Sequence, residues 1–239
     1  RMNEHSHPGA LPKYIQVSEM LIRRIAAGQL ADGARLPPER TFARGLGISV
    51  GTLRKSLAEL AEKNLLERIQ GSGNYVRHRP DVASLYTFFR LEKVGGGGMP
   101  TAEALTVDRL AKPATAPDFG ASAEGHRIRR LRRLDGDVVA LEEVWLDGDQ
   151  TPKLAVSDLS ESLYHFYRTQ LGLVIARVQD RVGIAPIPDW APTGFHMARG
   201  QVAGYIERVS HSQNAQAVEF SRTWFDSERA AYVSRMGRV

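Results

Sequence analysis

The 239-residue chain contains no cysteine, which excludes disulfide bonds and thiolate metal sites. No apolar run approaches the roughly 20 residues that a helix needs to cross a bilayer, and no signal peptide is visible. We therefore expect a cytoplasmic protein. Residues 1–10 are polar and rich in histidine, and we expect this N-terminus to be disordered.

Signals of catalysis are also missing. The chain has no nucleophile-elbow motif, its seven histidines are scattered, and no pair of them has the spacing of metal ligands. Gly95 to Gly98 form a glycine run, but the Gly-Lys-Ser/Thr of a phosphate-binding loop does not follow. We predict no catalytic residues, no metal and no cofactor, and we expect that the protein is not an enzyme.

The charge that is present is unevenly distributed. The net charge is +5, but residues 1–79 hold 13 Lys and Arg against 7 Asp and Glu, whereas residues 80–239 hold 19 against 20. The basic excess therefore lies in the first third of the chain. This segregation favours a polyanionic partner for that segment, through phosphate neutralisation and counterion release.

Residues 36–76 read as helix, tight turn, helix and hairpin. A short helix is expected from Pro38, a break at Gly45 to Gly47, and a longer helix opened by Ser49 with leucines on its buried side. Strand-like pieces around residues 65–68 and 75–76 flank a turn with two glycines. This order predicts a winged helix-turn-helix, which places its second helix in a DNA major groove. The alternative is a small helical cap with a surface hairpin.

Three motifs support the DNA-binding interpretation. The segments 33–40, 49–54 and 65–76 resemble the DNA-binding domain of GntR-family bacterial transcription regulators, so we assign residues 11–79 to that domain. Val50 stands where family members usually carry Arg, and Asn74 stands where they usually carry Thr. The exposed side of the second helix and the resemblance together give these DNA-binding candidates: Arg40, Ser49, Gly51, Thr52, Arg54, Lys55, Arg68, Gly71, Ser72 and Gly73.

A linker over residues 80–84 is expected to lead into a second domain, residues 85–239. Alternating apolar residues predict antiparallel strands with one main helix, which is an α+β arrangement. The expected strands span residues 126–134, 138–146, 174–187, 202–210 and 217–225, with an edge strand in the tail 228–236. Residues 102–110 are a strand or an irregular segment, 158–172 a helix, and 113–122 and 188–196 loops with a short helical piece.

Charged residues on these strands suggest an anion site. Arg130 and Arg132 are two apart and share a strand face, so their guanidiniums can grip one carboxylate or phosphate. The return strand carries Glu142 and Glu143, and the pattern does not say which of them faces this site. The alternative is that both arginines are solvated and pair with the glutamates.

The second domain resembles the UTRA effector domain of the HutC subfamily, which is similar in fold to chorismate lyase. The Arg-Leu-Arg, Ser-Leu-Tyr and last-strand motifs carry this resemblance. It implies a chorismate-lyase-like antiparallel α+β domain that senses a small molecule. The ligand-binding residues implied are Thr87, Arg130, Arg132, Glu142, Ser162, Tyr164, Glu219 and Phe225, the last often being Tyr in relatives.

We thus expect a sequence-specific DNA-binding transcription regulator, by default a repressor, controlled by a small anionic metabolite. Its expected partners are a palindromic double-stranded operator and a second copy of the chain. Two alternatives stay open: a DNA-binding protein that needs no ligand, and an enzyme of chorismate-lyase-like fold.

Overall fold

The computed structural model describes residues 12–26, 28–79, 88–96, 98, 100–159 and 162–234. The chain divides into two compact units: among the described residues the first unit holds 12–91 with 232–234, and the second unit holds 92–231. The expected disordered segment 1–10, the linker 80–84 and Thr87 lie outside the described residues.

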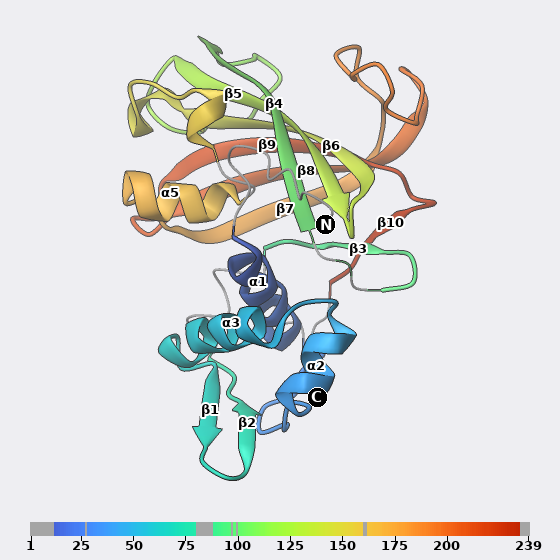
Figure 1. Cartoon of the computed structure of the whole chain (residues 1–239). Coiled ribbons are helices and arrows are strands. Elements are labelled where there is room, and N and C mark those ends of the chain that lie inside the picture. Colours follow the sequence, from blue (N-terminus) through green and yellow to red (C-terminus); the bar gives the residue numbers. More distant parts are fainter. Residues whose placement is uncertain are drawn as a thin grey trace. The chain divides into compact units, whose positions relative to one another are not determined.

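The described part of the first unit contains the helices α1 (Lys13–Ala26), α2 (Glu39–Gly45) and α3 (Val50–Glu62), drawn in blue to cyan in Figure 1. The predicted start of α3 is confirmed, because the Ser49 side chain accepts a hydrogen bond from the Thr52 amide at 3.1 Å. The apolar faces of α1 and α3 form the core of this unit. Its buried side chains include Val17, Leu21, Ile22, Ile25, Leu53, Leu57 and Leu60.

The hairpin of the first unit is also confirmed. β1 (Leu66–Ile69) and β2 (Gly73–Val76) pair in antiparallel register. The chain entering α2 adds a third stretch beside β2, because the Val76 amide donates to the Ala34 carbonyl at 2.9 Å. The sequence pattern did not indicate this third stretch.

The second unit is built on a six-stranded antiparallel sheet in the order β4-β5-β6-β9-β8-β7. The five long predicted strands are confirmed, and the ambiguous segment 102–110 is a strand, but of the edge strand predicted over 228–236 only residues 230–232 form a strand. Two short strands, β3 (Leu91–Lys93) and β10 (Ala230–Tyr232), form a separate two-stranded sheet. The six strands are β4 (Pro100–Ala111), β5 (Glu124–Leu134), β6 (Asp137–Asp147), β7 (Ile175–Pro186), β8 (Val202–Ser212) and β9 (Ala217–Phe225).

The helix predicted over residues 158–172 starts too early. Val156–Asp158 form a separate 3-10 turn, η2, which ends where Leu159 takes an extended conformation. The helix α5 (Leu163–Leu171) starts anew at Ser162, whose side chain accepts from the His165 amide at 3.3 Å. A further 3-10 turn, η1, spans Gly148–Gln150.

The short helical pieces predicted in residues 113–122 and 188–196 are wrong. Both segments are loops with hydrogen-bonded turns, closed from the amides of Ala116 and Ala191 to the carbonyls of Pro113 and Pro188. Each segment contains one further proline, Pro117 or Pro192, which lacks the amide hydrogen that continues a helix.

Both faces of the sheet are covered. The helix α5 lies on one face, where its tyrosines bond to β8 and β9. On the other face an apolar cluster joins the strands to the loop after β7. That cluster includes Leu141, Ile187, Ala191, Met197 and Trp224. Polar side chains on the α5 face are therefore enclosed between helix and sheet.

Candidate functional sites

The exposed side of α3 carries the first group of DNA-binding candidates. Gly51, Arg54 and Lys55 are exposed, and the Arg54 side chain is 66% exposed. Ser49 and Thr52 have a structural role as well, because their hydroxyls lie 2.9 Å apart at the helix cap. The exposed side of α3 is therefore cationic.

Arg54 connects α3 to the neighbouring elements. Its Nε donates to Glu39 on α2 at 2.6 Å, and Arg68 of β1 donates to its carbonyl at 3.4 Å. Arg40 follows Glu39 on α2 and is exposed. Lys55 instead leans toward α1, with its Nζ 5.9 Å from the ring centre of Tyr14. The structure thus brings Arg54 and Arg68 together and turns Lys55 aside.

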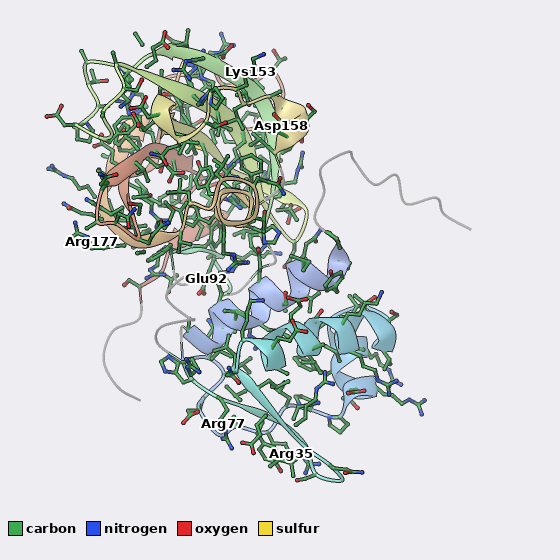
Figure 2. All side chains as sticks on the ribbon, turned by 90° about the vertical axis from the view of Figure 1, so that its left-hand side faces the viewer. Arg35, Arg77, Glu92, Lys153, Asp158 and Arg177 are labelled. Carbon is green, nitrogen blue, oxygen red and sulfur yellow. The ribbon has the colours of Figure 1, made fainter. Side chains whose placement is uncertain are left out.

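The tip of the hairpin holds Gly71, Ser72 and Gly73. The Ser72 hydroxyl bonds to the Tyr75 hydroxyl at 2.6 Å. A Cβ on Gly73 would lie 3.1 Å from the Arg35 Nε, so the absence of a side chain lets this arginine pack across the hairpin. Figure 2 labels Arg35 beside the hairpin. Arg35 belongs to the motif 33–40 but is not among the predicted DNA-binding residues.

The centre of the second unit holds a buried ionic cluster. Arg130 and Arg132 are only 7% and 8% exposed, so they are not solvated, but the pairing with a glutamate that the alternative predicted is present. Both pair with Glu142: the Arg130 Nε lies 2.5 Å from Glu142 Oε2, and the Arg132 Nη2 lies 3.3 Å from Glu142 Oε1. One carboxylate therefore holds two guanidiniums side by side on the α5 face of the sheet.

The charge of Glu142 is fixed by these neighbours. Burial by itself raises the pKa of this carboxyl, but the charges and hydrogen bonds of Arg130 and Arg132 outweigh burial and lower the pKa to about 2. Glu142 is therefore ionised at neutral pH, and its charge offsets one of the two guanidiniums.

The choice between Glu142 and Glu143 is now clear from their positions. Glu143 points to the opposite face, where it accepts from Arg129 at 2.9 Å and from the Trp145 indole at 3.1 Å. Only Glu142 shares a face with Arg130, its direct cross-strand partner.

A second carboxylate, Glu219, lies on the same face and is surrounded by hydroxyls. It accepts from Tyr167 at 2.5 Å, from Ser210 at 2.9 Å and from Tyr164 at 3.2 Å. Burial raises the pKa of Glu219 despite these hydrogen bonds and the charges of nearby arginines. Burial and the neighbouring Glu219 also raise the pKa of both tyrosines, so the phenols stay protonated and donate.

A third guanidinium, which was not among the predicted residues, lies on this face. Arg208 of β8 donates to both oxygens of Asp180 on β7, at 2.6 and 2.8 Å, and it also bonds to Tyr164. Burial lowers the pKa of Arg208, but the hydrogen bonds and charges of its partners outweigh this effect and raise it. Arg208 shares a strand face with Ser210, but only the pairing of β7 with β8 places it against Asp180.

The remaining candidates have distinct positions. Ser162 caps α5, and Phe225 lies on the sheet face of Glu219, opposite Ala140. The Phe225 ring occupies the space that a Cβ on Gly204 would need, so a glycine is required there. Thr87 lies outside the described residues. The structure thus brings together Arg130, Arg132, Glu142, Tyr164 and Glu219.

The described residues contain neither a cluster of metal-ligating side chains nor a membrane-spanning helix. In residues 12–26, 28–79, 88–96, 98, 100–159 and 162–234, no three His, Asp or Glu side chains gather as a metal site would require. No helix in these ranges is long and apolar enough to span a membrane.

Known proteins resemble the whole chain. Residues 13–76 match the family "Bacterial regulatory proteins, gntR family", and residues 97–231 match the UTRA domain. The chain is 54% identical to the HTH-type transcriptional regulator SmoD of Agrobacterium fabrum, over 95% of this chain and 97% of SmoD. It is 27% identical to the Escherichia coli mannosyl-D-glycerate transport/metabolism system repressor MngR, over 92% and 94%.

A solved structure shares the fold. The crystal structure of YydK from Bacillus subtilis, described as a possible transcriptional regulator, covers 95% of this chain and 100% of its own. Its TM-score is 0.54 at 22% identity, which is a likeness of fold alone.

Proposed function

The chain belongs to the gntR family of bacterial regulatory proteins, and we propose that it is a homodimeric repressor whose DNA affinity is lowered by a small anionic metabolite. The chain is a DNA-binding transcription regulator with a UTRA effector domain. The observation that carries the proposal is the buried pair of guanidiniums, Arg130 and Arg132, held by one carboxylate. We also propose that it works in the cytoplasm and catalyses no reaction.

The charges of the site support an anionic ligand. Arg130, Arg132 and Arg208 are matched by two paired carboxylates, Glu142 and Asp180. Burial disfavours the ionised form of the remaining carboxyl, Glu219, so an added anion would balance the cluster better than a neutral or cationic ligand. A carboxylate or phosphate offers the planar or forked acceptors that guanidinium groups bind.

The rest of the site suits a polyhydroxylated body. Glu219 accepts three hydrogen bonds from protein hydroxyls, and its protonated form, which burial favours, has one O–H to donate to a ligand hydroxyl. Both carboxylate oxygens of Glu142 already accept hydrogen bonds from Arg130 and Arg132. We therefore propose that Glu142 orients these two arginines and does not contact the ligand. MngR is named for mannosyl-D-glycerate, a sugar that carries a carboxylate, and this supports the same ligand class.

For the DNA-binding unit we propose that α3 enters the major groove and that Arg40, Arg54 and Arg68 contact phosphates. Two such units in a two-fold dimer would read half-sites about 10 base pairs, or about 34 Å, apart. Ligand binding then shifts the population of dimers toward a spacing of the two DNA-binding units that does not match the half-sites. This shift needs a coupling free energy of only ~1–3 kcal/mol.

The test has two steps. An operator is selected from random duplex DNA with the purified chain, and carboxylated and phosphorylated sugars are then screened by thermal shift. A sugar that raises the melting temperature should also release the operator, whereas its uncharged parent should do neither. The proposal fails if the selected DNA has no inverted repeat and no anionic sugar releases it. Conversion of the bound sugar into a product would indicate an enzyme instead.

A further inference from the structure

The hairpin of the first unit and the stretch beside β2 form a small sheet with two unlike faces. Arg35 lies opposite Tyr75, and Tyr75 lies opposite Glu67 on β1. Because side chains alternate along a strand, Gly73 and Arg77 share the face of these three residues. These five residues form the outer face of the hairpin. The side chains of the opposite, inner face are buried in the core, and they include Leu36, Leu66 and Val76.

The two guanidiniums of the outer face differ in their partners. The Arg77 Nε donates to Glu67 at 2.8 Å, so a carboxylate offsets the charge of Arg77. Arg35 is exposed, and no carboxylate in the part of the chain that the structure describes pairs with it. The outer face therefore carries one uncompensated positive charge, which belongs to Arg35.

Gly73 determines where the Arg35 side chain lies. A Cβ on Gly73 would be 3.1 Å from the Arg35 Nε and 3.5 Å from its Nη2. The guanidinium thus lies across the backbone of Gly73, the first residue of β2 after the turn. The φ angle of Gly73 is +135°, so backbone conformation and close approach both favour glycine here. The uncompensated charge of Arg35 is in this way held near the hairpin tip, as Figure 2 shows.

A second guanidinium lies on the inner face of the hairpin. Arg68 is on that face, because it neighbours Glu67 along β1, and its Nη2 donates to the Arg54 carbonyl of α3 at 3.4 Å. The inner face near the tip is therefore turned toward α3, and the outer face is turned away from it. Arg68 and Arg35 point to opposite sides of the hairpin and cannot share one small anion.

We propose that Arg35 binds a phosphate of the DNA backbone from the outer face of the hairpin. With α3 in the major groove, the outer face points away from that groove, toward the backbone that borders the adjacent minor groove. A phosphate offers the forked acceptors that a guanidinium binds, and Arg35 has no carboxylate to release first. Such a contact fixes the register of the protein on DNA without reading a base. The inference rests on DNA binding by the first unit, and neither on the dimer nor on the sugar.

The first test is Arg35→Ala in the full chain, measured by fluorescence anisotropy on the duplex selected with the unchanged chain. Affinity should fall about tenfold, and the slope of log affinity against log salt should fall by about 1, because one phosphate contact is lost. The matched control is the double change Glu67→Ala with Arg77→Ala. It removes one cation and one anion from the same face, so the salt slope should stay unchanged.

The second test distinguishes a phosphate from a base. Methylphosphonate replaces one phosphate at a time, which removes one negative charge and leaves every base in place. At one position this replacement should cost the unchanged chain about tenfold in affinity and the Arg35→Ala chain almost nothing, because the contact is already absent. The Arg68→Ala chain should remain sensitive at that position, since Arg68 lies on the inner face.

The third test examines the positioning role of Gly73. Gly73→Ala should weaken DNA binding by displacing the Arg35 side chain and by straining the backbone. The strain is the same in a chain that also carries Arg35→Ala, so the additional loss caused by Gly73→Ala should be smaller there. An equal loss in both chains would show that Gly73 does not act through Arg35.

The outcomes decide between the contact and its alternatives. If Arg35→Ala changes neither the affinity nor the salt slope, Arg35 is a solvated cation and the proposal is wrong. If the affinity falls but every methylphosphonate costs both chains equally, Arg35 does not bind a phosphate and the proposal is also wrong. None of these results depends on finding a sugar that releases the operator, so the proposed regulation can fail independently.

Discussion

The two units use the same kind of ion pair in opposite surroundings. Arg54 pairs with Glu39 at 2.6 Å, and Arg130 pairs with Glu142 at 2.5 Å, yet the side chain of Arg54 is 66% exposed and that of Arg130 only 8%. In water, such a pair contributes little and opens readily. In the sheet, removing one partner leaves the other buried without an opposite charge. Solvent access, rather than distance, therefore makes one arginine available to a phosphate and fixes the other in place.

The largest difference is expected from removing each carboxylate. Glu142→Ala leaves two buried guanidiniums without their shared partner and should destabilise the second unit by about 3–5 kcal/mol. Glu39→Ala removes an exposed partner and should cost the first unit at most about 1 kcal/mol.

The molecule supplies separate probes for this test. All three tryptophans, Trp145, Trp190 and Trp224, belong to the second unit, so their fluorescence in urea follows that unit alone. Helical circular dichroism reports mainly on the first unit, which holds α1, α2 and α3. Equal losses for the two variants would contradict the contrast between buried and exposed pairs.

The second prediction concerns the ligand. Arg132→Lys keeps the charge but loses the forked donors, so affinity for an anionic sugar found in the screen should fall roughly tenfold to a hundredfold. Arg133→Lys is the matched control, because Arg133 pairs with Glu103 at the sheet edge. Calorimetric titration measures both variants, and an equal loss in both would remove Arg132 from the site.

The third prediction concerns DNA. Arg54→Ala should weaken operator binding about tenfold and reduce the slope of log affinity against log salt by about 1, because one phosphate contact is lost. Its stability should change by less than about 0.5 kcal/mol. Fluorescence anisotropy at several salt concentrations gives the slope. An unchanged slope would place Arg54 outside the interface.

The smallest expected effect is a pH dependence. The pKa of Glu142 is lowered from 4.5 to about 2 in the folded chain, so its contribution to stability is complete above about pH 4.5. The contribution is lost as the pH falls from there toward 2. Glu142→Gln should therefore flatten the dependence of the tryptophan-monitored unfolding free energy on pH between 5 and 3. If both chains lose stability in parallel, other carboxyl groups dominate.

Local signals predicted the first unit almost completely. The Gly45 break, the Ser49 cap and the hairpin glycines each act within a few residues, so the sequence pattern contains them. In the second unit, alternation predicted the long strands for the same reason. It failed at the start of α5, where competing caps at Asp158 and Ser162 divide one apolar pattern into two elements.

The effector site was predicted only in part, because its contacts join distant strands. Arg130 and Arg132 were visible as a pair on one strand, and Glu142 follows them across a hairpin. Arg208 meets Asp180 only through the pairing of β7 with β8, and no local pattern indicates which charged residues become buried neighbours. The choice between Glu142 and Glu143 likewise needed the register.

The central claim is that ligand binding in the second unit and DNA binding in the first unit are thermodynamically coupled. The most direct measurement is the dissociation constant of an anionic sugar from the screen, determined by calorimetry with and without saturating operator. Linkage requires operator to weaken sugar binding by the same factor by which the sugar weakens operator binding, about 5–150-fold for typical coupling. A sugar dissociation constant that is the same in both titrations would contradict the account.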